Sequence, residues 1–134
     1  MKYPESVLKS INVRVVESTF RCDELFDSKT FEVKLNDQIT TNNLEDQIEI
    51  RNELSIELFN EAGTFKLMAK ILGNFTLSNH QSMSEKEVNY LIRTSTTTII
   101  FPYLRAFVTS LTALSGISPI TLPLINIGQA MKDE

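Results

Sequence analysis

Few residues in this 134-residue chain combine the types and spacing that catalysis needs. His80 is the only histidine and lies in the polar segment SNHQS, where a catalytic role would need an orienting partner. Cys22 is the only cysteine, and a lone thiol after a strand is more often a small apolar filler than an activated nucleophile. We therefore expect that the protein is not an enzyme.

Metal and cofactor chemistry also lack a sequence signal. No cluster of Cys, His, Asp and Glu has metal-ligand spacing, and the four glycines form no phosphate-cradling loop. A net charge of -4 argues against nucleic acid and against anionic lipid as partners. The chain is thus predicted to bind no metal, cofactor or nucleic acid.

The compartment is indicated by what the chain lacks at its start and in its apolar stretches. The lone cysteine excludes an internal disulfide, and MKYPESVLKS lacks the features of a signal peptide. The stretches LPLINI and TIIFPYL fall short of the roughly 18 apolar residues that a membrane span needs. We expect a soluble, cytoplasmic protein with no membrane insertion.

The first half of the chain reads as strands of one domain that spans residues 1–134. Apolar and polar residues alternate over 11–20, 31–35 and 48–58, and alternation resumes from Phe65 after the turn NEAG. No helical pattern separates these strands, so the sheet is predicted to have four antiparallel strands. Gly73 interrupts the fourth strand, where a bulge or bend is expected.

The second half of the chain changes to a helical pattern. Ser84 and Glu87 match a capping box, which predicts a short first helix. The β-branched run 94–98 predicts a break or kink, and Pro102 then marks the start of a second helix that Gly116 ends. The fold class is therefore α+β, with the sheet packed against a broken long helix.

The chain carries more apolar side chains than one sheet face and its helices can cover. The second helix has apolar residues on two sides and no acidic residue, which predicts an oligomer interface. Its residues are Tyr103, Phe107, Leu111 and Leu114. An ordinary core with a homodimer competes here with self-association combined with a groove for other chains.

One motif in this helix carries a family resemblance. Phe101-Pro102-Tyr103-Leu104-Arg105 resembles the Phe-Pro-Tyr-x-Arg helix start of the SecB protein-export chaperones, and LPLIN is similar to their Leu-Ala-Pro-Ile-Asn. The order of elements is also similar: a long crossover after the second strand, a hairpin, a strand end with Gly73 and Phe75, and the broken helix. The resemblance extends roughly from Leu8 to Met131.

This resemblance implies an ATP-independent holdase that binds non-native polypeptides in apolar grooves, with protein export as its setting. It also implies a homotetramer built as a dimer of dimers, with the long helices between the sheets. A helix buried at such an interface cannot leave carboxylates unpaired without a large cost, which accounts for the missing acidic residues. Arg105 would then pair with a carboxylate of a neighbouring subunit.

Two departures from the family favour a different client. Members that serve the SecA motor present acidic residues on the exposed sheet face, and the matching positions here hold Glu17, Arg21, and Met68 or Lys70. Leu124 stands where the family has a proline. The alternative is a SecB-like chaperone dedicated to one partner, such as an antitoxin of a toxin–antitoxin system. SecA and an antitoxin both stay open as partners.

The client groove is expected between the apolar segment ISPITLPLINI and the sheet, because two prolines keep this segment from forming a helix and leave its side chains available. Alternatively, the segment simply covers the end of the core. The groove residues predicted for client binding are Phe31, Val33, Leu35, Phe75, Ile117, Ile120, Leu122, Leu124 and Ile125.

Overall fold

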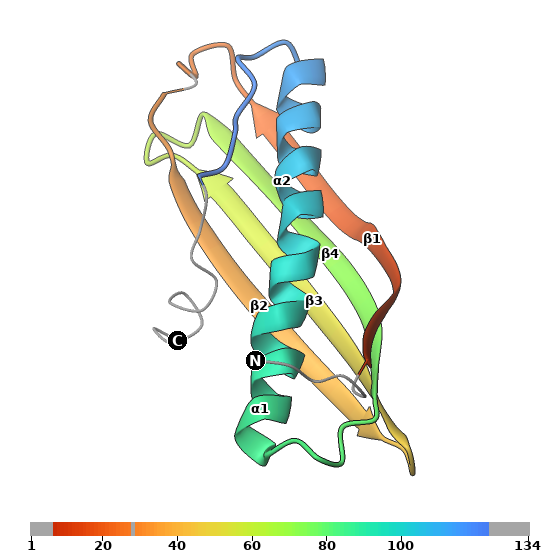
Figure 1. Ribbon diagram of the computed structural model, residues 1–134. Helices are drawn as coiled ribbons and strands as arrows, with labels where there is room; N and C mark the ends of the chain where they lie inside the picture. The colour runs from red at the N-terminus through yellow and green to blue at the C-terminus, as the bar shows by residue number, and fades with distance from the viewer. Residues whose placement is uncertain (1–6, 28, 124–134) are drawn as a thin grey trace.

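Alternating apolar and polar side chains form four strands in the computed structural model, which describes residues 7–27 and 29–123 (Figure 1). The strands are β1 (Val7–Cys22), β2 (Glu32–Asn43), β3 (Gln47–Phe59) and β4 (Phe65–Ser78). All neighbouring pairs are antiparallel, in the order β1-β4-β3-β2. The predicted four-stranded antiparallel sheet is confirmed.

The crossover lies after the first strand, and the expectation of a long crossover after the second is wrong. β2 and β3 are joined by the tight turn 44–46, in which the Leu44 N–H donates to the Gln47 carbonyl. β1 pairs with β4 and β2 lies at the opposite edge, so residues 23–31 cross from one side of the sheet to the other. In that crossover Phe26 stacks on Phe65 with ring centroids 4.2 Å apart.

Strand β2 is also longer than residues 31–35, the extent that the sequence predicts. Residues 36–43, NDQITTNN, have the composition of a loop, yet they pair with β3 as far as the Asn43–Ile48 pair. Strand propensity depends strongly on what the neighbouring strand provides, and here β3 supplies a complete ladder.

The irregularities of the sheet lie in β1. Its register against β4 shifts between Ser10 and Asn12 and again between Val15 and Glu17, which leaves Ile11 and Val16 as inserted residues. The bulge expected at Gly73 is therefore on the neighbouring strand, while β4 runs uninterrupted through the glycine.

A single helical rod follows the sheet. It consists of α1 (Glu85–Tyr90), one π-helical segment η1 (Leu91–Ser95) and α2 (Thr96–Leu114). The capping box is confirmed, since the Glu87 N–H donates to Ser84 Oγ and the Ser84 N–H donates to Glu87 Oε1. Gly116 ends the rod with φ of 87°, a left-handed conformation that suits glycine.

The prediction that Pro102 starts a helix is wrong, because this residue lies inside α2. The run 94–98 also does not break the rod. Thr96 and Thr97 are buried, and their hydroxyls donate to the carbonyls of Ile92 and Arg93 one turn earlier. These bonds satisfy two carbonyl groups of the π-helical segment, so threonines that weaken an isolated helix support this one.

The rod crosses one face of the sheet obliquely, from β2 toward β1 (Figure 1). Its successive contacts are Arg93 with Asp37 of β2, Thr96 with Asn52 of β3, and Ile100 beside Gly73 of β4. The core lies between the helix and the sheet, and it consists mainly of the inner faces of β3 and β4 and of one side of α2. Within residues 7–27 and 29–123, no helix covers the opposite face of the sheet (Figure 1).

The length and apolarity of the helical rod bear on the expectation of no membrane insertion. The rod Glu85–Leu114 has 30 residues and is apolar enough to cross a bilayer by length and composition, although no single apolar stretch of the sequence is long enough. The core helix of a soluble protein meets the same criterion, and Ile100, Leu104 and Val108 of this rod are fully buried against the sheet. The finding is weak support for a membrane span.

Candidate functional site

The segment 117–123 is held against the helix by three hydrogen bonds. Arg105 Nε donates to the Leu122 carbonyl at 2.8 Å, and Thr109 Oγ1 donates to the Ile120 carbonyl at 2.9 Å. The Ile120 N–H donates in turn to Thr112 Oγ1 at 2.9 Å. The partner of Arg105 is thus a backbone carbonyl of its own chain, where a carboxylate of a neighbouring subunit was expected. The segment returns along the β2 side of the helix in Figure 1.

The predicted groove residues of this segment differ in how accessible they are. Ile120 and Leu122 are buried in the core, and Ile117 is half-buried against it. Leu124 and Ile125 lie outside the described residues. The buried pair can meet another chain only if the segment moves, and in this structure the two side chains are part of the core.

The predicted sheet residues fall into two separate groups. Phe31 and Leu35 are half-buried against the core and Val33 is 39% exposed, all at the end of β2 that follows the crossover. The Phe31 ring meets Phe65 edge to face. Phe75 is also buried, but it lies on β4 ten residues beyond Phe65. At about 3.3 Å per residue, this separation is about 33 Å along the strand. Phe75 therefore does not line the same surface as Phe31.

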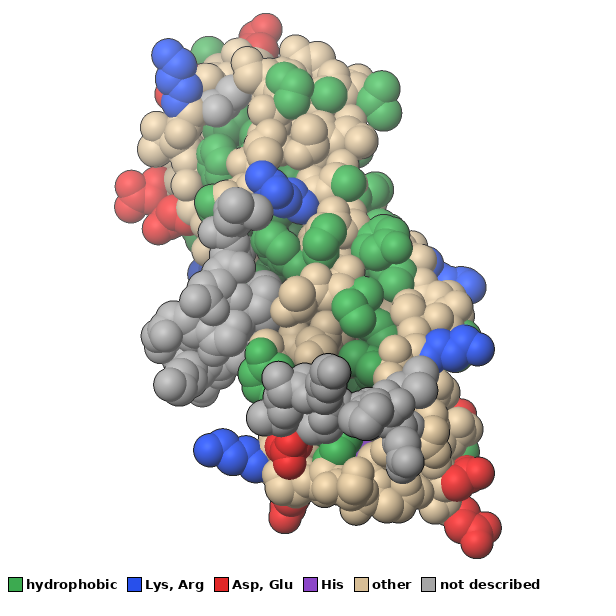
Figure 2. Space-filling view, in the orientation of Figure 1, with side chains coloured by type: hydrophobic (Ala, Val, Ile, Leu, Met, Phe, Trp, Pro, Cys, Tyr) green, Lys and Arg blue, Asp and Glu red, His purple; other side chains and the backbone are tan. Residues whose placement is uncertain are grey.

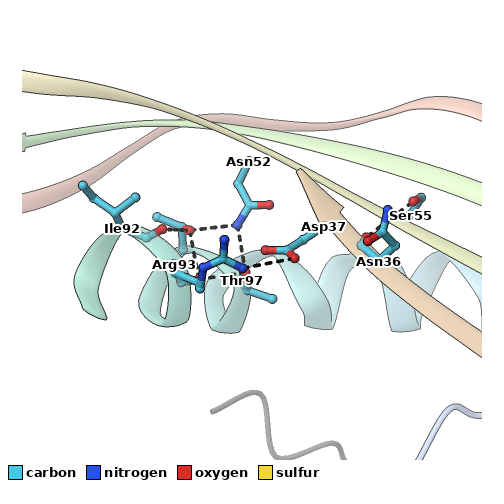
Figure 3. A network of polar contacts seen from close by, with 8 residues as sticks. Asn36, Asp37, Asn52, Ser55, Ile92, Arg93 and Thr97 are labelled. Atoms are coloured by element: carbon cyan, nitrogen blue, oxygen red, sulfur yellow. Dashed lines mark hydrogen bonds and ion pairs between the residues drawn. The ribbon is translucent and has the colours of Figure 1, made fainter. Parts of the chain in front are cut away.

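A polar network between sheet and helix was not anticipated from the sequence (Figure 3). Asn52 is fully buried, and its Nδ2 donates to Thr96 Oγ1 and Thr97 Oγ1, both at 2.8 Å. On β2 the Asp37 side chain is 1% exposed, and its Oδ1 lies 3.6 Å from Arg93 Nη1. The available signal was that Asn52 shares the inward parity of Ile50 and Leu54, whereas Asp37 lies beyond the predicted strand 31–35 and gave none.

The outward face of the helix is largely apolar. Tyr103 is 57% exposed and Leu114 is 88% exposed, while Phe107 and Leu111 are half-buried against the core. Hydrophobic side chains gather along the helix in Figure 2, and most acidic side chains lie at the rim of that face. The four predicted interface residues thus comprise two open positions and two that also serve the core.

The outer face of the sheet carries paired charges of both signs. Lys70 Nζ lies 3.8 Å from Glu17 Oε1 and 3.6 Å from Glu53 Oε1. Arg51 lies 3.7 Å from the other Glu53 oxygen. These exposed pairs contribute little to stability, but they place a cation beside both Glu17 and Glu53. Near one end of this face is a hollow of about 500 Å³, lined by Phe59, Arg21, Lys66 and neighbouring residues.

Cys22 and His80, the two residues considered for catalysis, lie at the end of β1 and in the turn before α1. Burial and, secondarily, the Asp23 carboxylate raise the pKa of the Cys22 thiol, which disfavours the reactive thiolate. His80 is half-buried in the turn before the helix, and its carbonyl accepts the Met83 N–H. Within residues 7–27 and 29–123, no group of three His, Cys, Asp or Glu side chains could hold a metal ion.

Comparison with known proteins decides the family. The model of the family "Preprotein translocase subunit SecB" matches residues 10–133. The chain belongs to the SecB family. Two "Protein-export protein SecB" sequences, from Wolbachia sp. subsp. Drosophila simulans and from Wolbachia pipientis, are 26% identical to it over 121 residues. Each match covers 90% of this chain and 66% of the relative, so the chain spans just under two thirds of its relatives' length.

Solved structures show that this SecB-family chain shares its fold with other proteins. The SecB-like chaperone of Mycobacterium tuberculosis, in complex with a peptide from an antitoxin, matches with a TM-score of 0.61 and 16% identity. That match covers 89% of this chain and 91% of the chaperone. A protein of unknown function from Streptococcus agalactiae matches with a TM-score of 0.58 and 11% identity, over 89% and 98% of the two chains. The fold of sheet and long helix is confirmed.

Proposed function

We propose that this protein is an ATP-independent cytoplasmic holdase that keeps non-native polypeptides from aggregating. The observation that carries the proposal is the SecB family match over residues 10–133. The apolar side chains left open on the helix and on β2 support it, because a surface of this kind binds extended apolar segments without reading their sequence. The activity needs no metal, cofactor or nucleotide.

The client groove is proposed along the start of β2 and the segment 117–125. Val33 is open to solvent, and Phe31, Leu35 and Ile117 are partly open, so these four side chains are the first that a client would meet. Ile120 and Leu122 form the floor, and Phe75 belongs to a different part of the core. Leu124 and Ile125 are proposed as its continuation.

The protein is also proposed to form a homotetramer, a dimer of dimers, through the outward face of α2. Tyr103 and Leu114 would be covered there, with Phe107 and Leu111 beneath them. The absence of acidic side chains from residues 96–114 supports this arrangement, since a carboxylate buried without a partner at such an interface would be costly.

The holdase proposal is tested by aggregation assays without nucleotide. We expect the purified protein to suppress the aggregation of several unrelated, chemically unfolded proteins at stoichiometric amounts. Unchanged aggregation of all of them would reject a general holdase. Turnover of a small substrate would contradict the expectation that the protein is not an enzyme.

The groove proposal is tested by one charge on β2. Val33→Asp should weaken binding of an unfolded client about tenfold, because a carboxylate would face the client's apolar side chains. Val16→Asp is the matched control, since Val16 is 44% exposed on the other edge strand and lies outside the proposed groove. Equal binding by both variants, with circular dichroism showing both folded, would remove the groove from the start of β2.

A dedicated chaperone for one partner, such as an antitoxin, is the second candidate. It is favoured by the outer face of the sheet, where the Lys70 ammonium lies between Glu17 and Glu53 and interrupts the acidic side chains expected for docking the SecA motor. The related fold of the chaperone seen with an antitoxin peptide agrees with this candidate.

Co-purification from the native host followed by peptide mapping separates the two candidates. A general holdase should return many unrelated polypeptides, with apolar segments protected. A dedicated chaperone should return one partner in stoichiometric amount. Binding of purified SecA, measured by calorimetry, would support the export function and count against the dedicated one.

A further inference from the structure

Two basic side chains face each other at one end of the outer sheet face. Arg21 of β1 and Lys66 of β4 are partners in the strand register, and both are exposed. Like charges directly opposite each other in an antiparallel pair destabilise a sheet. Lys66 Nζ lies 3.9 Å from Glu57 Oε1, whereas Arg21 has no ion pair with any residue that the structure describes. This end of the sheet therefore carries a cation for which the described residues provide no counter-charge.

An aromatic ring lies next to these two cations on the same face. Phe59 of β3 pairs in register with Lys66, so Arg21, Lys66 and Phe59 form one row across three neighbouring strands. Phe59 is half-buried, and Lys34 Nζ of β2 lies 5.2 Å from the centre of its ring. The row thus combines two exposed cations, which attract a carboxylate, with an apolar ring on which another apolar side chain can pack.

The row borders the hollow of about 500 Å³ at this end of the sheet. Arg21, Lys66 and Phe59 line it together with Glu57 and part of the turn between β3 and β4. Glu57 is the one acidic residue among the described residues that line it, so the lining carries a net positive charge on a chain whose net charge is -4. Pockets that hold small ligands have volumes of about 300 to 1,000 Å³, so this hollow is large enough for one large side chain and its neighbours.

The rim of the hollow is held in place by hydrogen bonds of the turn between β3 and β4. Asn60 Oδ1 accepts the N–H groups of Thr64 and Phe65, at 3.0 and 3.1 Å. The Asp23 N–H donates to the Thr64 carbonyl at 2.8 Å, which joins the end of β1 to the same turn. The hollow is thus formed before a partner binds, and binding adds little ordering cost on this side.

We propose that this hollow docks a partner protein through a short segment in which a carboxylate side chain lies next to a large apolar one. The carboxylate binds between Arg21, whose guanidinium group offers two parallel N–H donors, and Lys66, while the apolar side chain packs on the Phe59 ring. Binding supplies the counter-charge that Arg21 lacks. The site lies on the sheet face opposite the helix and the proposed client groove, so this inference goes beyond the holdase function and does not rest on it.

Charge reversal at Arg21 should remove the site without harming the fold. Arg21→Glu places a carboxylate opposite Lys66 and converts a like-charge pair into an opposite-charge pair, so the midpoint of urea unfolding should stay the same or rise. Binding of an acidic peptide should weaken about tenfold, because a carboxylate then faces the incoming carboxylate. In a purely structural role, by contrast, a loss of binding would accompany a loss of stability.

Lys9→Glu is the matched control for this substitution. Lys9 lies on the same strand and the same face, is exposed, and pairs with Thr76, ten residues along β4 from Lys66. The substitution changes the net charge by the same amount, at a distance of about 33 Å along the strand. Binding of the peptide should stay within about twofold of the wild type, because exposed charges at that separation are screened by salt.

The probe is a fluorescein-labelled synthetic peptide with the core Glu-Phe-Glu between glycine and serine spacers, and its binding to the whole chain is followed by fluorescence anisotropy. Peptides with the cores Gln-Phe-Gln and Glu-Ala-Glu should each bind about fivefold more weakly, because the first lacks the charges and the second lacks the apolar ring. Raising the salt concentration should weaken the binding of Glu-Phe-Glu and leave that of Gln-Phe-Gln unchanged. A peptide with the core Lys-Phe-Lys should not compete.

Weaker binding of Glu-Phe-Glu by Arg21→Glu than by Lys9→Glu, with binding of a reduced, alkylated and permanently unfolded lactalbumin unchanged in both, supports the inference. Equal peptide binding by the two variants, or no binding by the wild type, overturns it. A parallel loss of lactalbumin binding in Arg21→Glu also overturns it, because the peptide would then be bound as a client. Tighter binding of an oligothymidylate than of the peptide would assign the hollow to nucleic acid instead. If the wild type binds the peptide but no unfolded protein, the inference stands and the holdase function falls.

Discussion

At the scale of single residues, the contact between helix and sheet depends on a glycine and an asparagine that face each other across β3 and β4. Gly73 pairs in register with Asn52, and both lie beneath the helix at its closest approach. Asn52 donates to Thr96 and Thr97 there. Gly73, which has no side chain, lets the helix approach the sheet closely, and Asn52, a buried hydrogen-bond donor, fixes the position of the helix along the strand.

Gly73→Ala tests this closest approach. A Cβ at this position would lie 2.6 Å from Ile100 Cγ2 and 2.8 Å from a ring carbon of Phe75, so the helix would have to move. We expect a loss of about 2 kcal/mol in the free energy of unfolding, measured with urea. Combination with Ile100→Ala should give a smaller loss than the sum of the two single changes, by about 1 kcal/mol. Strict additivity would show that the two groups do not meet.

The thiol of Cys22 allows a second test at this scale. Because burial and the Asp23 carboxylate raise its pKa, less thiolate is present at a given pH than in an unfolded chain. Alkylation by iodoacetamide at pH 8, followed by mass spectrometry, should be slower in the folded protein than in urea. Asp23→Asn should recover part of the rate. Faster alkylation of the folded protein than of the unfolded chain would indicate an activated thiol and reopen the question of catalysis.

At the scale of elements, the segment 117–123 is ordered by its hydrogen bonds to α2 as well as by burial of its apolar side chains. Arg105, Thr109 and Thr112 lie along one side of the helix and bond to the backbone of Ile120 and Leu122. A segment with two prolines cannot satisfy its own backbone as a helix, and the polar side chains of α2 provide those partners instead.

Arg105→Met should loosen this segment while keeping the apolar stem of the side chain. The lost bond from Nε to the Leu122 carbonyl is charge-assisted and partly buried, so we expect a loss of about 1 to 2 kcal/mol in the free energy of unfolding. Limited proteolysis should cut within residues 117–123 more rapidly. Arg51→Met, which affects only an exposed ion pair, should cost less than about 0.5 kcal/mol. Equal losses in the two variants would show that the segment is held by burial alone.

At the scale of the whole molecule, the sheet and the helical rod of the described residues leave two large faces that none of the described elements covers. The outer sheet face carries ion pairs of Lys66 with Glu57 and of Lys70 with Glu17 and Glu53, and the outward helix face is apolar. The second face would gain more from being covered by another chain, because burial of apolar surface drives association.

Tyr103→Asp tests the proposed tetramer at this face. Tyr103 is 57% exposed, so the monomer should tolerate the change, while a carboxylate buried without a partner at the interface should weaken assembly by about 3 kcal/mol. Light scattering should show smaller species than the wild type at micromolar concentration. Asn36→Asp on the exposed outer sheet face is the control and should leave the mass unchanged. A wild-type mass equal to that of one chain would reject the proposal.

The sequence by itself determined the elements whose signals are local. Alternation predicted the sheet, the Ser84–Glu87 capping box predicted the start of the helix, and Gly116 predicted its end. These features depend on a few neighbouring residues and on backbone geometry, so a short stretch of sequence contains them. The Phe-Pro-Tyr-x-Arg motif led to the family in the same way, through consecutive residues.

The tertiary structure alone decided the features that depend on distant partners. Pro102 is accepted inside a helix whose neighbouring residues Phe101 and Leu104 are buried against the sheet, and NDQITTNN forms a strand because β3 supplies a complete ladder. Burial of Ile120 and Leu122, and the separation of Phe75 from Phe31, follow from where the chain returns along α2. Asp37 meets Arg93 across 56 residues of sequence, and no local pattern specifies which distant groups share a buried site. The arrangement of the candidate groove could therefore be obtained only from the packing of helix on sheet.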